Sequence, residues 1–176
     1  MARSRSLTRI QPSWRRLGWP LLAAVGLAVV DQVVKLAVLA APPDFPVVPG
    51  LFAVRFGTNT GVAFGLLQRF PLAVTFVGGG ILVALLAYLG RITPVATTLE
   101  RAALSLIIGG AMGNLADRLR LGYVVDYLDL CIGRYHWPTF NLADSAITIG
   151  ASMLALGLIR GQRAQAPRRA GSEDGE

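Results

Sequence analysis

The chain has 176 residues, of which 53% are hydrophobic and 15% are charged, and its mean hydropathy is +0.54. Because soluble domains carry about 25% charged residues, this composition excludes an ordinary water-exposed globule and favours a surface that contacts lipid. The net charge of +7 comes mostly from arginines near the two ends and in short loops, which argues against a nucleic-acid-binding face. One cysteine, Cys131, and one histidine, His136, are too few for an internal disulfide or a Cys/His zinc site, so no metal or cofactor is expected.

Four segments are long and apolar enough, or nearly so, to form membrane-spanning helices, which need about 20 mostly apolar residues. They run from about residue 17 to 41, 71 to 89, 102 to 119 and 142 to 159. The first segment is too long for the apolar region of a cleaved signal peptide, so we expect it to be retained. The expected fold is therefore an all-α polytopic membrane protein with four transmembrane helices.

The segments between and beyond these spans complete the expected organisation. A strand-like run from Leu51 to Phe56, followed by a turn at Asn59-Thr60-Gly61, predicts a small β element in the first outer loop. Residues 1–16 form a basic tail, residues 17–160 the membrane domain, and the polar residues 161–176 a disordered tail.

The arginines predict the orientation of the spans. Eleven lie in the two tails and in the loop between the second and third spans, whereas five lie in the other two loops. Because cytoplasmic loops of membrane proteins carry an excess of Lys and Arg, both termini are expected in the cytoplasm. The longer loops, residues 42–70 and 120–140, then face outward.

Several polar side chains lie in or beside the expected spans, where charges are costly and mark functional sites or internal partners. The predicted orientation brings residues of three spans to one depth, in the outer half of the membrane or just outside it. Asp31 and Lys35 share a helix face, as do Asn114, Asp117 and Arg118, and as do Asn141 and Asp144. The remaining members of this set are Asp126 and, in the outer loop, Asn59.

Each of these residues also has a structural interpretation. Asp31 and Lys35 form an ion pair that is more readily structural than catalytic, and Asn114, Arg118 and Asn141 could serve as helix caps or interfacial anchors. A proton relay through Asp31, Lys35 and Asp117 would instead suit a small transporter or channel. A third class, a scaffold without enzymatic activity, would need no carboxylate pair. The convergence of several carboxylates at one depth is what a purely structural interpretation explains least well.

Two neighbouring carboxylates that share one proton can activate water without a metal or a nucleophile. Serine peptidase chemistry fits less well, because His136 lies in an outer loop and Lys35 has a nearer partner in Asp31. The G-x-G-D motif of presenilin-like proteases is absent.

Five sequence blocks, in order along residues 25 to 150, carry a family resemblance. They are D-Q-V-V-K at 31–35, N-T-G-V-A-F at 59–64, G-G-A-M-G-N-L-A-D-R at 109–118, V-D-Y at 125–127 and F-N-L-A-D-S at 140–145. The chain resembles the lipoprotein signal peptidases, also called signal peptidase II. The one departure noticed is Tyr127, where phenylalanine is usual in the family.

The resemblance implies an aspartyl endopeptidase of the membrane that cuts diacylglyceryl-modified prolipoproteins just before the lipidated cysteine. It implies that Asp126 and Asp144 are the catalytic pair and that globomycin inhibits the enzyme. Residues expected to bind substrate or order the site are Asn59, Gly61, Asn114, Arg118 and Asn141. Residues expected to support the site structurally are Asp31, Lys35 and Asp117. The family requires no cofactor, and its partners are lipidated substrates and membrane lipid.

Overall fold

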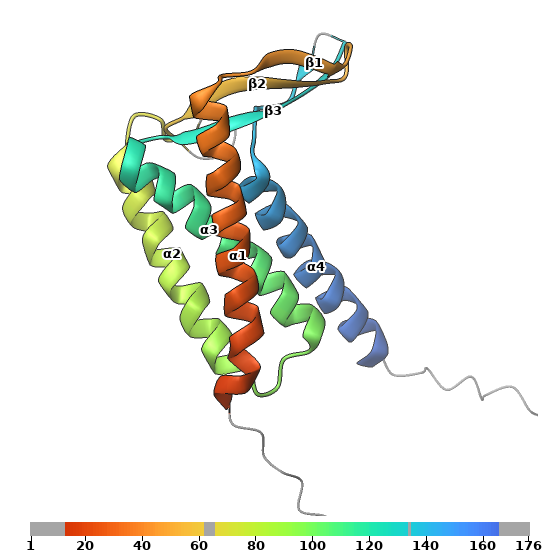
Figure 1. Cartoon of the computed structure of the whole chain (residues 1–176). Coiled ribbons are helices and arrows are strands. Elements are labelled where there is room, and N and C mark those ends of the chain that lie inside the picture. The colour runs from red at the N-terminus through yellow and green to blue at the C-terminus, as the bar shows by residue number, and fades with distance from the viewer. Residues whose placement is uncertain (1–12, 62–65, 134, 166–176) are drawn as a thin grey trace, which may run out of the picture.

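A computed structural model describes residues 13–61, 66–133 and 135–165, in which long helices form a bundle and a small sheet covers one end of it (Figure 1). The helices are α1 (Ser13–Ala40), α2 (Pro71–Ile92), α3 (Thr98–Leu121) and α4 (Leu142–Gln165). Helix α1 begins, and helix α4 ends, at the end of the bundle opposite the sheet (Figure 1). The helices therefore run between the sheet and the end where the tails emerge.

Local sequence signals fix several helix ends. Helix α2 starts with Pro71, whose missing N–H is not needed in the first turn. Helix α3 starts with a capping box, in which the Thr97 side chain accepts from the Glu100 N–H and the Glu100 carboxylate accepts from the Thr97 N–H. Helix α3 ends at Gly122, whose φ of 81° is the left-handed conformation that glycine adopts without strain. The turn after α3 thus directs the chain into the sheet.

Among the described residues, three helices are long and apolar enough to cross a membrane: α1 over Leu17–Ala40, α2 over Pro71–Ile92 and α4 over Leu142–Arg160. The sequence-based prediction of four spans is confirmed for these three only. Helix α3 has sufficient length but carries charged residues at both ends, among them Glu100, Arg101, Asp117, Arg118 and Arg120. Its composition therefore differs from that of a lipid-exposed helix.

Helix α3 is the central helix, because it packs against α1, α2 and α4 (Figure 1). Glycines on α3 allow the close approach of its neighbours. A Cβ at Gly109 would meet the backbone of Ala24 in α1, and one at Gly110 would meet the backbone of Ala143 in α4. Small residues at helix interfaces are typical of membrane bundles, where close packing and polar contacts hold helices together.

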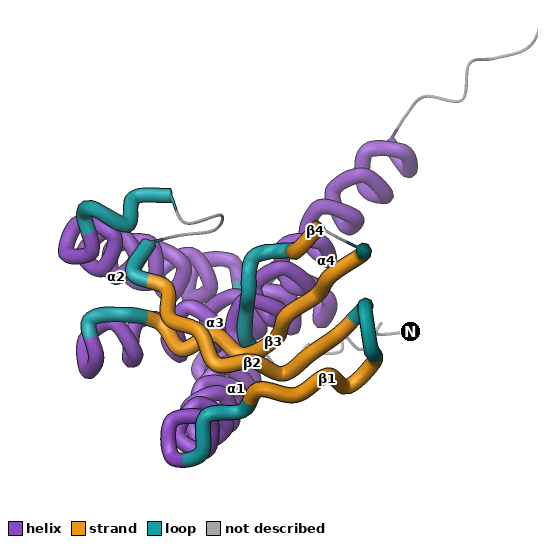
Figure 2. Tube along the Cα trace, turned by 90° about the horizontal axis from the view of Figure 1, so that it is seen from above, coloured by secondary structure: helices purple, strands orange, loops and turns teal. Residues whose placement is uncertain are grey.

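The sheet is larger than the sequence predicted. It contains β1 (Asp44–Val48), β2 (Phe52–Asn59), β3 (Val124–Ile132) and β4 (Tyr135–His136), all antiparallel and in that order. The β element predicted in the loop between the first two helices is confirmed as β1 and β2, and β2 includes residues 52–56 of the predicted strand; the strands that follow α3 were not predicted. The segment between α3 and α4 supplies β3 and β4, and β3 pairs with β2 (Figure 2).

A row of charged side chains crosses the four strands. Arg55 on β2 contacts Asp44 on β1 at 2.9 Å and Asp129 on β3 at 3.0 Å, and Asp129 lies 3.3 Å from His136 on β4. Asp129 is buried, so its two partners compensate the removal of its carboxylate from water. The single histidine of the chain thus has a structural environment in the sheet.

The tails fall mostly outside the described residues. Helix α1 begins at Ser13, so the expected basic tail is described only in its last residues, and residues 1–12 lie outside the described part. Helix α4 continues to Gln165, and residues 166–176 of the expected disordered tail lie outside it as well.

Candidate active site

The first turn of α4 presents Asp144 at the sheet end of the bundle. Asn141 caps the helix: its Oδ1 accepts from the Asp144 N–H at 2.9 Å, while the Asn141 N–H donates to Asp144 Oδ2 at 3.3 Å. The two preceding N–H groups are satisfied from other elements, since Leu142 N–H donates to the Tyr127 hydroxyl at 3.2 Å and Ala143 N–H donates to Asp31 Oδ1 at 3.0 Å. The position of Asp144 is therefore set by α1, β3 and α4 together.

Asp126 lies on β3 and is almost completely buried, with 1% of its surface exposed. The backbone of the preceding residue, Val125, is fixed by two side chains. Its N–H donates to Asp117 Oδ2 at 3.1 Å, and its carbonyl accepts from Asn141 Nδ2 at 3.2 Å. Asn141 Nδ2 also donates to Asp126 Oδ1 at 2.8 Å. One residue, Asn141, thus contacts both aspartates.

The environment of Asp126 favours its protonated form. Burial, and next the negative charge of Asp144, raise the pKa of Asp126 to about 7, against the opposing effect of the Asn141 hydrogen bond. Because desolvation disfavours a buried charge and two nearby carboxylates resist simultaneous ionisation, the pair retains a proton close to neutral pH. This is the electrostatic condition that general acid and general base chemistry by two carboxylates requires.

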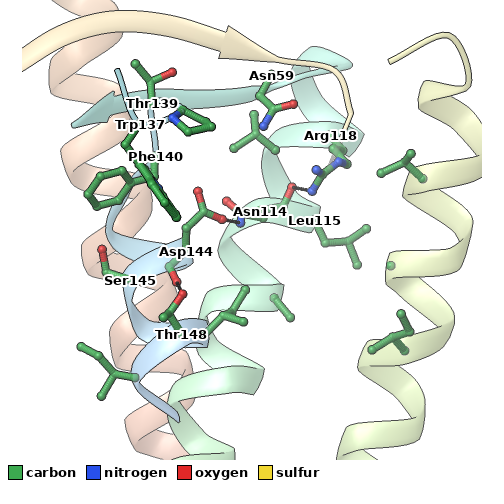
Figure 3. Close-up of a pocket in the computed structure, with 18 of the residues that line it drawn as sticks. Asn59, Asn114, Leu115, Arg118, Trp137, Thr139, Phe140, Asp144, Ser145 and Thr148 are labelled. Carbon is green, nitrogen blue, oxygen red and sulfur yellow. Dashed lines mark hydrogen bonds between the residues drawn. The ribbon is translucent and has the colours of Figure 1, made fainter. Parts of the chain in front are cut away.

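Asn114 connects this pair to α1. Its Nδ2 donates to Asp144 Oδ1 at 2.7 Å, and its Oδ1 accepts from Lys35 Nζ at 2.9 Å and from Asn141 Nδ2 at 3.3 Å. Figure 3 shows the Asn114 and Asp144 side chains pointing toward each other from α3 and α4. The sequence-predicted residues Asn114, Asn141, Asp126 and Asp144 therefore belong to one hydrogen-bonded group.

A cavity of about 710 Å³ opens beside this group, between α2, α3 and α4. Its polar wall includes Asn59, Asn114, Arg118 and Asp144, and Figure 3 shows these side chains facing one space. Its other walls are mainly apolar; they include Val74, Ile81, Leu115, Ile147 and Ile149. Asp126 lies behind the wall and not on it. The cavity thus joins a polar region near the sheet to an apolar region along the helices.

Arg118 and the turn after β2 form one edge of the cavity. Arg118 Nη2 donates to the Gly61 carbonyl at 2.6 Å, and the Gly61 N–H donates to Asn59 Oδ1 at 2.9 Å. A Cβ at Gly61 would collide with the carbonyl of Leu66, so the turn requires glycine there. The structure brings Asn59, Gly61 and Arg118 together as the sequence predicted; Val62, Ala63 and Phe64 of the same block lie outside the described residues.

The predicted ion pair of Asp31 and Lys35 is part of a larger buried cluster. Lys35 Nζ lies 2.8 Å from Asp31 Oδ2 and 3.0 Å from Asp117 Oδ2, and all three side chains are 0% exposed. Asp117 also accepts from Gln32 Nε2 at 2.9 Å and from Arg120 Nη2 at 3.5 Å. Because the buried lysine is paired with carboxylates, its charge is compensated inside the bundle.

Sequence reasoning missed several residues of the site. Gln32 is a polar residue within an apolar span and could have been singled out on that ground. The role of Tyr127 depends on the tertiary contact with α4, and the cavity wall formed by Trp137, Pro138 and Thr139 lies outside the sequence blocks named above. Within the described ranges, no group of three or more His, Cys, Asp and Glu side chains is arranged to hold a metal ion.

Comparison with known proteins places the chain in a family. The model of the family described as "Signal peptidase (SPase) II" matches residues 23–160. The chain belongs to the signal peptidase II family. Curated relatives named lipoprotein signal peptidase include one from Geobacter metallireducens, 41% identical over 165 residues that cover 89% of this chain and 98% of the relative. Another, from Moorella thermoacetica, is 42% identical over 145 residues, with 79% and 91% covered.

Solved structures of membrane enzymes share the fold of this chain. Two structures, each titled as a bacterial membrane enzyme, match with TM-scores of 0.70 and 0.68 at 28% and 31% sequence identity. The first match covers 90% of this chain and 96% of the solved one, and the second covers 81% and 94%. This signal peptidase II family member is therefore a multi-pass membrane protease with the bundle-and-sheet fold of known membrane enzymes.

Proposed function

We propose that the protein is an aspartyl endopeptidase that removes the signal peptide from diacylglyceryl-modified prolipoproteins by cutting just before the lipidated cysteine. Asp126 and Asp144 are its catalytic pair, and Asn59, Gly61, Arg118 and Asn114 contact or order the substrate. The observation that carries the proposal is the contact of Asn141 with both aspartates beside a cavity that is polar near the sheet and apolar along the helices.

The reaction needs only the two carboxylates and a water molecule. The ionised carboxylate takes a proton from water, the water oxygen bonds to the scissile carbonyl carbon, and the protonated carboxyl gives its proton to the carbonyl oxygen. When the tetrahedral intermediate collapses, the carbon–nitrogen bond breaks and the first carboxyl gives its proton to the leaving nitrogen. The second carboxylate takes back a proton from the intermediate's hydroxyl, which restores the starting state.

The shape of the cavity suits a substrate that is anchored in lipid. A prolipoprotein carries an apolar signal segment and two acyl chains, so its cleavage site lies at the membrane surface. Apolar walls along α2 and α4 match such a substrate, and polar groups at the sheet end match the peptide bond. The cavity opens between helices, so a substrate reaches it from the bilayer.

The proposal includes the arrangement in the membrane. Helix α3 crosses the bilayer together with α1, α2 and α4, since its buried polar residues face partners within the bundle and not lipid. Both termini lie in the cytoplasm of a bacterial inner membrane, and the sheet and the catalytic pair lie at the outer face, as the excess of arginine in the tails indicates.

A transporter or channel is less well supported, because among the described residues the buried charged side chains lie in the half of the molecule next to the sheet and form no path across the bundle. A scaffold protein would not need the contact of one asparagine with two carboxylates. Family membership and the site point to the peptidase instead.

The deciding experiment is cleavage of a diacylglyceryl-modified prolipoprotein by the purified protein in detergent. The unlipidated precursor, added globomycin and the Asp144→Asn variant are run in parallel. We expect cleavage of the lipidated precursor alone, and its loss with globomycin or in the variant. Absence of cleavage by a folded wild-type protein would contradict the proposed function and make proton flux in liposomes the next measurement.

A further inference from the structure

The orientation of two side-chain amides determines what each aspartate contacts. An asparagine amide has an acceptor oxygen at one end and a donor nitrogen at the other, so its effect on a neighbouring carboxylate depends on which end faces it. Asn114 and Asn141 both touch the aspartates. The groups that bind the other end of each amide therefore decide whether its nitrogen or its oxygen faces the aspartate.

Lys35 fixes the orientation of Asn114. A lysine ammonium has three donors and no acceptor, so the Asn114 atom that lies 2.9 Å from Lys35 Nζ must be the oxygen. The nitrogen of the same amide then faces Asp144 Oδ1, at 2.7 Å. The Lys35 ammonium is kept in place by two ion pairs in a fully buried site, with Nζ 2.8 Å from Asp31 Oδ2 and 3.0 Å from Asp117 Oδ2.

Asn141 is oriented in the same manner by the backbone. The Asp144 N–H, which can only donate, binds its oxygen at 2.9 Å, so its nitrogen faces Asp126 Oδ1. Asp144 and Asp126 each accept from one of these two amides, and Asp126 has a further side-chain hydrogen bond with Asn59, but their remaining environments differ. Asp144 sits at the N-terminus of α4, whose partial positive charge favours an anion, and accepts a second N–H from Asn141. Asp126 lies buried on a strand.

We propose that Lys35 is a positioning residue that acts through Asn114 and makes Asp144 the ionised member of the pair, leaving the shared proton on Asp126. Asp144 is then the group that takes the proton from water, and Asp126 the group that protonates the carbonyl oxygen. This inference rests on the proposed peptidase function and assigns its two proton-transfer roles. The raised pKa of Asp126, caused first by burial, agrees with this assignment.

Other charged and titratable groups surround the pair, and the test must keep them in place. From α1 these are Asp31 and Lys35, from α3 Asp117 and Arg118, and from β3 Tyr127; Arg120 in turn lies against Asp117. Replacing Lys35 alone would leave the buried carboxylates of Asp31 and Asp117 with only Arg120, which lies against Asp117, to compensate their charge. The paired variant Lys35→Met with Asp31→Asn removes one charge of each sign, and the amide oxygen that it places at position 31 can still accept the Ala143 N–H.

The experiment measures kcat and KM against pH for the wild type, the Asp31→Asn variant and the paired variant, with folding checked by circular dichroism and thermal melting. In the paired variant the acid limb of the kcat profile should move to higher pH by about one to two units, the size expected for one hydrogen bond to a charged group, with KM little changed. The Asp31→Asn control, which keeps the Lys35–Asn114 contact, should retain the wild-type acid limb. An unmoved limb in a folded paired variant would overturn the inference while leaving the peptidase function intact.

A second measurement does not depend on the folding of the paired variant. The Asp126→Asn and Asp144→Asn variants are prepared with ¹³C-labelled aspartate, and their infrared spectra are recorded as a function of pH. The spectrum of the double variant at the same pH is subtracted from each, so that the difference reports the one remaining aspartate of the pair. The protonated-carboxyl band should persist to higher pH in Asp144→Asn, where Asp126 remains, than in Asp126→Asn. The reverse order would overturn the assignment. Failure of the wild type to cleave lipidated precursor would instead contradict the proposed peptidase function.

Discussion

Asn141 combines several roles at the site. It caps α4, contacts both aspartates and holds the carbonyl of Val125, and it is completely buried while doing so. A buried amide with all of its groups bonded has one available geometry, because any rotation would leave a polar atom without a partner. The two carboxylates therefore have a fixed relation before any substrate arrives, which reduces the reorganisation that catalysis requires.

The first prediction concerns the pair itself. Asp126→Asn or Asp144→Asn keeps the size of the side chain but removes a proton-transfer group, so cleavage should fall by about 100-fold or more while the bundle remains folded. The measurement is the rate of cleavage of lipidated precursor, normalised to folded protein. Asp44→Asn, which alters an exposed carboxylate on β1, is the matched control and should cleave at nearly the wild-type rate. Near-normal turnover by a folded Asp144→Asn protein would remove Asp144 from the pair.

A second prediction follows from the raised pKa of Asp126, about 7 in the fold against an ordinary value of 3.8. The folded state binds this proton more tightly than the unfolded state, so the free energy of unfolding should fall as pH rises from about 4 to about 7 and then level off. Asp126→Asn removes this dependence. Above pH 7 its melting temperature should exceed that of the wild type by roughly 2–4 °C for each kcal/mol recovered. An identical pH dependence of melting in both proteins would contradict the assigned pKa.

At the scale of elements, the central helix decides how the site is assembled. Helix α3 supplies Asn114 and Arg118 to the cavity, and its glycines set its distance from α1 and α4. Since Asn114 reaches both Lys35 on α1 and Asp144 on α4, a small separation of these helices would break hydrogen bonds on both sides. Close helix packing is thus a condition for the catalytic geometry as well as for stability.

The third prediction tests that packing. In Gly110→Ala the new Cβ would collide with the Ala143 backbone at the start of α4, so we expect a loss of about 1–3 kcal/mol in stability together with reduced cleavage. Gly90→Ala on α2 is the matched control, because a Cβ there meets nothing within 4 Å. The two variants are compared by thermal melting and by cleavage rate. Equal behaviour of the two would show that the contact between α3 and α4 is not tight at Gly110.

The sheet could be predicted from the sequence only in part. Helices were predictable because apolar length and proline or glycine signals are local. Helical spacing grouped the polar residues of the expected spans, whereas Asp126 and Asn59, which lie on strands, were assigned to the site by the family resemblance. Strand β3 was not predicted, although its run from Val124 to Ile132 is rich in apolar residues, because its partner β2 lies about 70 residues earlier in the sequence. The hydroxyl of Tyr127 and the orientation of Asn114 likewise depend on tertiary contacts that no local pattern records.

At the scale of the whole molecule, the orientation in the membrane is open to a direct test with the single cysteine. Cys131 lies on β3 with part of its surface exposed. If the sheet faces outward, a membrane-impermeant maleimide should label Cys131 in intact cells. In the double variant Cys131→Ser with Val95→Cys, the thiol lies in the exposed turn between α2 and α3, and labelling should require permeabilised cells. Labelling of the cysteine at position 95 alone in intact cells would reverse the orientation.

The start of α4 has a consequence for how the protein is made. Its first N–H groups are bound by Tyr127, Asp31 and Asn141, which come from β3, from α1 and from the residue just before the helix. During synthesis, α1 is complete long before α4 emerges and β3 only a short loop before it, and Asp144 reaches its place only when the last helix docks. Because Asp144 belongs to the proposed catalytic pair, we expect a ribosome-bound chain that lacks α4 to have no proteolytic activity. On this proposal the protein cuts signal peptides only after its last helix is in place, and nascent membrane proteins inserted beside it are not exposed to a partly assembled protease.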